Sequence, residues 1–428
     1  MTNNQPPVKE KIFTKYQVFM IAIIAIIQFT VILDFMVLSP LGAVLMPKLH
    51  ISTAQFGLVV SVYAFSAGAS GILAAGFADK FDRKKMLLFF YTGFLLGTFL
   101  CAIAPDYHFL LMARIVTGIF GGVIGSVGFA IVTDLFKMEV RGRVMGFTQM
   151  AFGASQVLGL PVGMELSNRF GWHSPFWVIG GFGILVGIAI VIYMKPIIGH
   201  LLVKHDRSAF HHLAATVSKP TYLRAFMATT LLATGGFMMM PFGSAFSTGN
   251  LGLLLTQLPM LYFVTGLSSF ITGPLVGKLS DKIGKYRVFV MGSTISAAMV
   301  LIYTNLGVTP LWIICALNII LFAGIMSRLV ASSTLISAIP DMRDRGAFMS
   351  INSSVQQIAG GIAAGVAGLI VVQTPSGKLE HYPILGYVVI VSMIITAIMM
   401  FFLDRFVQRK LAAAKQPPVI VSEEAVIG

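Results

Sequence analysis

The chain has 428 residues, of which 57% are hydrophobic and only 11% are charged. A soluble domain of this size cannot hide so much apolar surface, because much of any globule stays in contact with water. The formal charge of +14 does not indicate nucleic-acid binding, because the basic residues are spread through short loops between apolar segments. The two cysteines lie inside apolar runs, so we expect no disulfide framework, metal site or cofactor.

The chain opens with a short polar tail and then an apolar run that is too long for the core of a signal peptide. A helix that crosses a bilayer needs about 20 apolar residues. Twelve segments satisfy this, so we predict an all-α membrane protein with twelve transmembrane helices. Their expected ranges are 16–46, 53–77, 86–104, 107–134, 144–168, 173–194, 221–247, 252–277, 287–305, 310–338, 346–373 and 382–404.

The basic residues predict how these helices are divided and oriented. If the N-terminus is cytoplasmic, 25 of the 30 Lys and Arg residues fall in the tails, the central linker and the charged short loops of the same side. We therefore expect both termini in the cytoplasm of a multi-pass protein of the plasma membrane, which is the inner membrane in a bacterium. The predicted parts are a tail (1–15), a six-helix bundle (16–194), a linker (195–220), a second six-helix bundle (221–404) and a tail (405–428).

A polar strip at residues 76–85 recurs at residues 277–287, which indicates an internal duplication. Aligning Asp79 with Asp281 gives an offset of 202 residues, and in each copy a basic residue follows four positions later, Arg83 or Lys285. Arg141 and Arg345 form a second matched pair at an offset of 204. Backbone polar groups in lipid need internal partners, so the helices must form bundles. We predict two bundles related by a pseudo-twofold axis.

Asp34 is the only carboxylate deep within an apolar run, and an ionisable group at membrane depth is a functional candidate by default. At about 1.5 Å per residue, Asp34 lies roughly 27 Å along the first helix, and Arg114 lies roughly 10 Å into the fourth helix from the other side. The two side chains are therefore expected at similar depth. Asp34 would alternate between a proton and a pairing with Arg114 or a cationic substrate. The alternative is a static pair that holds the two helices together.

Polar side chains near the middle of other helices are candidates to line a substrate cavity. The alternative for the amides is ordinary hydrogen bonding between helices. Arg328 lies about ten residues before Pro340 and would bind either an anionic substrate or a carbonyl at a helix end. The full set of candidates is Gln149, Gln156, Arg328, Asn352, Gln356 and Gln357.

The strip at residues 76–85 resembles motif A of the major facilitator superfamily, although Ala75 and Asp82 stand where that motif usually has glycine. Arg114 with the following Gly118 resembles the fourth-helix motif of the same family. The fifth predicted helix resembles the Gly/Pro motif of exporters, in particular of the drug:proton antiporter and sugar-efflux branch. Its residues are Gly159, Pro161 and Gly163.

This resemblance implies that the motif A loop helps to hold the two bundles together in the outward-open state. The alternative is that its charges only anchor the loops in the cytoplasm. An exposed ion pair contributes only about 0–1 kcal/mol, which is enough to bias two states of nearly equal energy. The residues expected to act in this gating are Asp79, Arg83, Lys84, Asp281, Lys285, Arg141 and Arg345.

We therefore expect a proton-coupled secondary active transporter that exports a small organic molecule (a drug-like compound, a sugar or a metabolite) by alternating access. The alternative within this class is a proton-coupled uptake symporter for an organic anion, using Arg114 and Arg328. The sequence has no nucleotide-binding loop and no cluster of His and acidic residues at membrane depth, so an enzyme is not expected. The expected partners are the substrate, protons and membrane lipids, and the chain is expected to act as a monomer.

Overall fold

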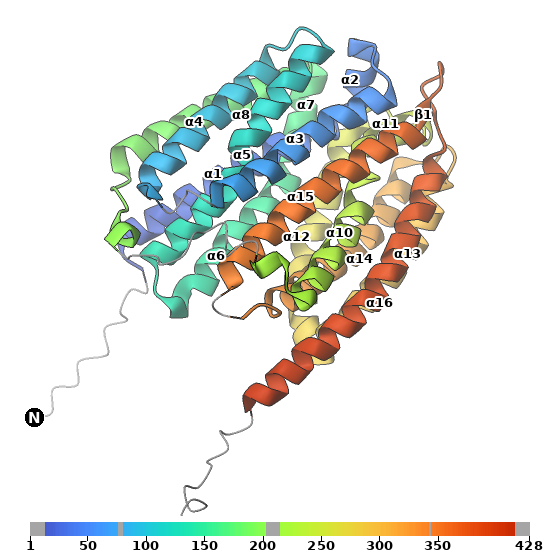
Figure 1. Ribbon diagram of the computed structural model, residues 1–428. Coiled ribbons are helices and arrows are strands. Elements are labelled where there is room, and N and C mark those ends of the chain that lie inside the picture. Colours follow the sequence, from blue (N-terminus) through green and yellow to red (C-terminus); the bar gives the residue numbers. More distant parts are fainter. Residues whose placement is uncertain (1–12, 76–79, 203–214, 342–343, 416–428) are drawn as a thin grey trace, which may run out of the picture.

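The computed structural model describes residues 13–75, 80–202, 215–341 and 344–415, and these are almost entirely helical (Figure 1). The first half contains α1 (Lys15–Val37), α2 (Gly42–Leu49), α3 (Thr53–Ala75), α4 (Arg83–Ala102), α5 (Tyr107–Leu135), α6 (Met138–Ala154), the π-helix η2 (Ser155–Gly159), α7 (Leu160–Phe170) and α8 (Ser174–Tyr193). The second half contains α10 (Pro220–Phe237), α11 (Gly243–Gly249), α12 (Leu258–Ile283), α13 (Lys285–Thr304), α14 (Leu311–Ser337), α15 (Arg345–Ile370) and α16 (Tyr382–Lys415).

Short elements complete the fold. The 3-10 helices are η3 (Gly199–Leu202), η4 (Met240–Phe242) and η5 (Leu255–Gln257), and a two-stranded antiparallel hairpin, β1 (Val372–Gln373) and β2 (Leu379–Glu380), precedes α16. Among the described residues, eleven helices are long and apolar enough to cross a membrane. The remaining predicted segment, 144–168, corresponds to α6, η2 and α7, which follow one another without a gap but have only 17, 5 and 11 residues.

The first and seventh predicted segments, 16–46 and 221–247, each contain a local break in the helix. α1 ends at Val37 and α2 begins at Gly42, while α10 ends at Phe237 and α11 begins at Gly243. Pro40 and Pro241 lie in the two breaks, where a proline cannot donate a backbone hydrogen bond and its ring crowds the preceding turn. The breaks are about 200 residues apart, so they repeat the internal duplication.

The buried apolar side chains form three clusters, of which one is shared by the two halves. One cluster of buried side chains draws on both halves and includes Leu41, Phe56, Phe242 and Leu258. A second cluster contains only residues of the first half and of the segment that directly follows α8. A third cluster contains only residues of the second half. Leu45 of α2 and Phe246 of α11 belong to the shared cluster. In Figure 1, α2, α11 and β1 lie at one end of the molecule, and α1 begins and α16 ends on the opposite side. We call these the α2/α11 end and the terminal end.

Hydrogen bonds between the halves also lie toward the α2/α11 end. The Ser244 hydroxyl accepts from the Ala43 backbone N–H at 3.3 Å, and the Thr53 hydroxyl donates to the Val371 carbonyl at 2.5 Å. Along α3 and α15, Gly57 and Gly368 allow close contact, since a Cβ on Gly57 would stand 3.1 Å from the Gly368 Cα. Near the terminal end the two halves have separate cores.

Candidate functional site

Asp34 and Arg114 form an ion pair in the interior of the first half. Arg114 Nη1 lies 2.8 Å from Asp34 Oδ2, and neither side chain is exposed. The same Nη1 also donates to the Asp34 backbone carbonyl at 3.3 Å, and the Thr98 hydroxyl donates to Asp34 Oδ1 at 3.1 Å. The prediction that Asp34 and Arg114 lie at the same depth agrees with this contact. The pair joins α1, α4 and α5 at one point.

An aromatic ring packs against the Arg114 guanidinium. Arg114 Cζ lies 4.4 Å from the centroid of the Tyr63 ring on α3, a geometry in which the ring face attracts a cation. Arg114 Nε and Nη2 are buried and have no hydrogen-bond partner. Phe35, next to Asp34, packs on Tyr63 at 5.0 Å and on Phe237 of the second half at 5.8 Å. The ion pair is therefore one residue away from a contact between the halves.

The Gly/Pro motif of the fifth segment is packed directly against the helix that carries Asp34. A Cβ on Gly159 would stand 2.5 Å from Leu33, and a Cβ on Gly163 would stand 2.7 Å from Val37. Pro161 cannot donate a backbone hydrogen bond, and the π-helix Ser155–Gly159 precedes it. The small residues let η2 and α7 approach α1 on both sides of Asp34.

The other predicted substrate residues are spread over both halves. Gln156 is buried in η2, and its Oε1 has no hydrogen-bond partner. Asn352 of α15 accepts from the Thr229 hydroxyl at 2.6 Å, while Gln356 and Gln357 are half-buried on the same helix. The side chain of Gln149 lies outside the described residues.

Arg328 belongs to the interior of the second half. Its side chain is buried, and the guanidinium carbon lies 5.9 Å from the centroid of the Phe289 ring on α13. Its Nε and Nη2 have no hydrogen-bond partner. Unlike Arg114, it makes no ion pair in the described part of the chain.

The predicted gating residues contact their own half wherever the structure gives them a contact. Arg83 is buried and forms an ion pair with Asp134 of α5 at 2.9 Å, a partner that sequence reasoning missed. Asp79, the expected neighbour of Arg83, lies outside the described residues. Lys84 donates a hydrogen bond to the Val191 carbonyl. Arg141 donates to the carbonyls of Phe136 and Thr133. In the second half, Lys285 is half-buried, and Asp281 and Arg345 are exposed.

Sequence reasoning also missed Asp344, which is buried next to Arg345. It forms an ion pair with Lys219 and accepts a hydrogen bond from the Tyr222 hydroxyl at 3.0 Å. The hydrogen bond to Asp344 raises the pKa of the Lys219 ammonium, which keeps this pair charged. The sequence signal available for Asp344 was its position in the repeated loop before the eleventh segment. Tyr63 and Thr98 offered no comparable signal, because both stand among apolar residues as ordinary helix positions.

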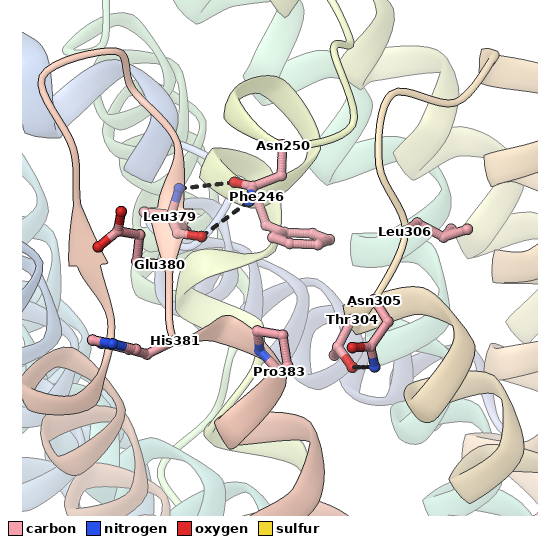
Figure 2. Close-up of a pocket in the computed structure, with 9 residues that line it drawn as sticks. All are labelled: Phe246, Asn250, Thr304, Asn305, Leu306, Leu379, Glu380, His381 and Pro383. Carbon is pink, nitrogen blue, oxygen red and sulfur yellow. Dashed lines mark hydrogen bonds between the residues drawn. The ribbon is translucent and has the colours of Figure 1, made fainter.

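A cavity of about 460 Å³ lies at the α2/α11 end, between α11, the end of α13 and the start of α16 (Figure 2). Asn250 closes one side by exchanging two hydrogen bonds with the Leu379 backbone. The cavity contains none of the predicted substrate residues. Its lining residues are Phe246, Asn250, Thr304, Asn305, Leu306, Leu379, Glu380, His381 and Pro383.

Comparisons with known proteins agree with this architecture. The family model described as Major Facilitator Superfamily matches residues 24–364 and again 225–426. The chain is 27% identical over 280 residues (64% of this chain, 70% of the relative) to the uncharacterized MFS-type transporter YceJ of Bacillus subtilis. It is 32% identical to multidrug resistance protein 3 of the same species, over 36% of this chain and 30% of that protein. Other matches are named for multidrug resistance and sugar efflux.

Among solved structures, a bacterial homologue of the human lysosomal transporter Spinster in an inward-facing, unoccupied conformation superimposes with a TM-score of 0.68. The two chains are 18% identical, and the match covers 95% of this chain and 100% of the other. At this identity the likeness concerns the fold alone, and it confirms the predicted all-helical membrane architecture.

Proposed function

The chain belongs to the major facilitator superfamily and is a secondary transporter rather than an enzyme, and on that premise we propose that it exports a small organic molecule in exchange for protons. Relatives named for multidrug resistance and sugar efflux support export of a drug-like compound or a sugar. The observation that carries the proposal is the buried Asp34–Arg114 pair.

Protonation of Asp34 is the chemical step of the proposed coupling. A charge at membrane depth is expensive, and the pair is tolerated because the two groups neutralise each other at 2.8 Å. A proton on Asp34 cancels the carboxylate charge and removes the ionic attraction, so the Arg114 guanidinium is left with the Tyr63 ring and the Asp34 backbone carbonyl. Phe35 contacts Phe237 of the second half, so a shift of α1 would change the contact between the halves.

Alternating access follows from the divided core. The halves share apolar packing at the α2/α11 end and have separate cores toward the terminal end. We propose that the α2/α11 end faces the outside, as the distribution of basic residues predicts, so that this arrangement is open toward the cytoplasm. Rocking of the halves would then close the terminal end and open the other.

Proton movement in proteoliposomes tests this proposal. Vesicles that contain the purified protein and a trapped pH-sensitive dye are given norfloxacin, ethidium or lactose, without an imposed gradient. Antiport predicts that a substrate entering the lumen makes the lumen more alkaline, and Asp34→Asn should abolish this response because an amide cannot carry the proton. Glu165→Gln is the matched control, since this carboxylate is exposed and pairs only within α7.

Two results would contradict the proposal. If Asp34→Asn retains the proton movement of the wild-type protein, Asp34 is not the coupling group. If a transported compound acidifies the lumen, protons and substrate move in the same direction, which is the behaviour of the uptake symporter. In that alternative, as in export, Arg328 is the candidate group for binding an anionic substrate.

A further inference from the structure

Arg328 is a buried cation without a carboxylate in its own half at the same depth. It lies 17 residues after the start of α14, or about 26 Å along that helix. Only 5% of the residue is exposed. The sequence has no Asp or Glu within residues 220–280, 286–340, 346–379 or 381–403, which cover the interiors of the second-half helices. Its charge is therefore not neutralised from within these helices.

The two buried arginines thus differ in charge balance. Arg114 is neutralised by Asp34, so the first-half site carries no net charge when Asp34 is ionised. Among the described residues, the face of the Phe289 ring is the electrostatic partner of Arg328, at 5.9 Å. A buried charge is stable only when it is paired or hydrogen-bonded, so this site has the charge and the free donors to bind an anion.

Further unused hydrogen-bonding groups lie on the helix that packs against Arg328. Ser293 and Ser296 of α13 are buried, and their hydroxyl oxygens have no partner. α13 packs closely on α14 here, because a Cβ on Gly292 would stand 3.1 Å from the Arg328 backbone nitrogen and a Cβ on Gly324 would stand 2.6 Å from the Ser296 hydroxyl. Guanidinium and hydroxyl groups are the donors that bind carboxylates, sulfonates and phosphates.

One glycine of α10 lies beside the guanidinium. A Cβ on Gly235 would lie 3.7 Å from Arg328 Nη2, in ordinary contact, whereas a Cβ on the exposed Gly236 would meet nothing within 4 Å. Gly235 therefore leaves this side of the guanidinium uncovered by a side chain of its own. Gly235 and Gly236 also lie just before Phe237, the residue that contacts the first half.

We propose that Arg328 binds the anionic group of the transported molecule, so that the substrate class is organic anions, including zwitterionic compounds that carry a carboxylate or sulfonate. This inference rests on the transport function proposed above and extends it by naming the substrate class. Binding supplies the charge that the second half lacks, while Asp34 serves the proton in the first half.

Thermal unfolding of the purified full-length protein with benzenesulfonate tests the binding step. Benzenesulfonate is anionic at all relevant pH values, and benzenesulfonamide is a neutral compound of similar shape. At ten times the dissociation constant, the sulfonate should raise the unfolding midpoint of the wild-type protein by about 1–2 °C, and the sulfonamide should not. Arg328→Met should lose this response and unfold no earlier than wild type, because a desolvated charge has been removed.

Substitutions at Gly235 and Gly236 give a matched pair of variants that tests the site without changing Arg328. Gly235→Ala fills the space beside the guanidinium without a clash and should weaken the response to benzenesulfonate at least tenfold in concentration. Gly236→Ala adds the same methyl group to open space and should leave the response unchanged. Equal behaviour of the two variants, or an unchanged response in Arg328→Met, would refute the site.

A transport measurement separates substrate from bound ion. Radiolabelled benzenesulfonate should enter wild-type proteoliposomes faster than Arg328→Met proteoliposomes. If sodium chloride alone raises the midpoint as much as benzenesulfonate does, or if the sulfonate binds without being transported, Arg328 holds an inorganic or static anion and the substrate proposal is wrong. Asp34→Asn should keep the thermal response while losing proton movement, so failure of proton coupling and failure of anion binding are seen separately.

Discussion

At the residue scale, the Asp34–Arg114 pair shows how a membrane interior accepts two charges. Each group would be prohibitively costly alone, and the pair is enclosed by Thr98, which donates to the carboxylate, and by Tyr63, which faces the guanidinium. The Arg114 atoms Nε and Nη2 remain without hydrogen bonds. The pair is therefore most stable while the carboxylate is charged, which fits the proposed role of Asp34 in proton exchange.

A double-mutant cycle measures this dependence. Arg114→Met alone leaves a buried carboxylate without its partner and should destabilise the protein by about 3–5 kcal/mol. Combining it with Asp34→Asn removes the orphaned charge, so the double variant should be more stable than Arg114→Met. The measurement is unfolding in detergent, followed for the wild type, both single variants and the double variant. Equal stability of Arg114→Met and the double variant would show that the two charges do not depend on each other.

At the element scale, glycines decide which helices of the two halves can touch. The Gly266 position of α12 faces the π-helix of the fifth segment, and a Cβ there would stand only 2.6 Å from the Gln156 carbonyl oxygen. Backbone cannot move aside as a flexible side chain can, so this contact requires glycine. The same contact holds the fifth segment, which packs on α1 through Gly159, against the second half.

Gly266→Ala should therefore destabilise the protein by about 1–3 kcal/mol through overpacking. Gly277→Ala on the same helix is its control, since a Cβ at that position meets nothing within 4 Å. Because alanine is the better helix former, Gly277→Ala should be neutral or slightly stabilising. Thermal unfolding in detergent compares the two variants, and equal midpoints would mean that the contact between α12 and η2 is looser than described.

At the scale of the whole molecule, the proposed alternating access requires the α2/α11 end, where the halves share a core, to part during transport. Ala43 and Ser244 are equivalent positions of the two halves, 201 residues apart, and they are joined by a hydrogen bond across the interface. A disulfide at this point would hold the halves together where they already touch.

Replacing Ala43 and Ser244 with cysteine, after changing Cys101 and Cys315 to alanine, tests this requirement. Oxidation should stop substrate-dependent proton movement, and reduction should restore it, because the α2/α11 end can no longer open. A protease site inserted near residue 208 lets a gel reveal the cross-link between the two fragments. Full activity of the cross-linked protein would show that this end stays closed throughout the cycle.

Much of the fold and part of the site follow from sequence patterns that need no partner. Apolar runs of membrane length and the 202- and 204-residue offsets predicted the helical membrane fold and its duplication, since each depends on the local chain alone. Asp34 and Arg114 could be chosen in the same way, because a charge in an apolar run is conspicuous wherever its partner lies. The breaks at Pro40 and Pro241 were overlooked because apolar residues continue through both of them.

The sequence by itself therefore determined the membrane fold, the duplication and the two residues of the ion pair. Tertiary structure alone decided their surroundings: Tyr63 against Arg114, Asp134 as the partner of Arg83, and Arg328 without a partner. A hydropathy pattern indicates which residues are buried, but it does not indicate which side chains they contact. In lipid, every helix is apolar all round, so the face that packs inward is set by side-chain shape and by the glycines that permit contact.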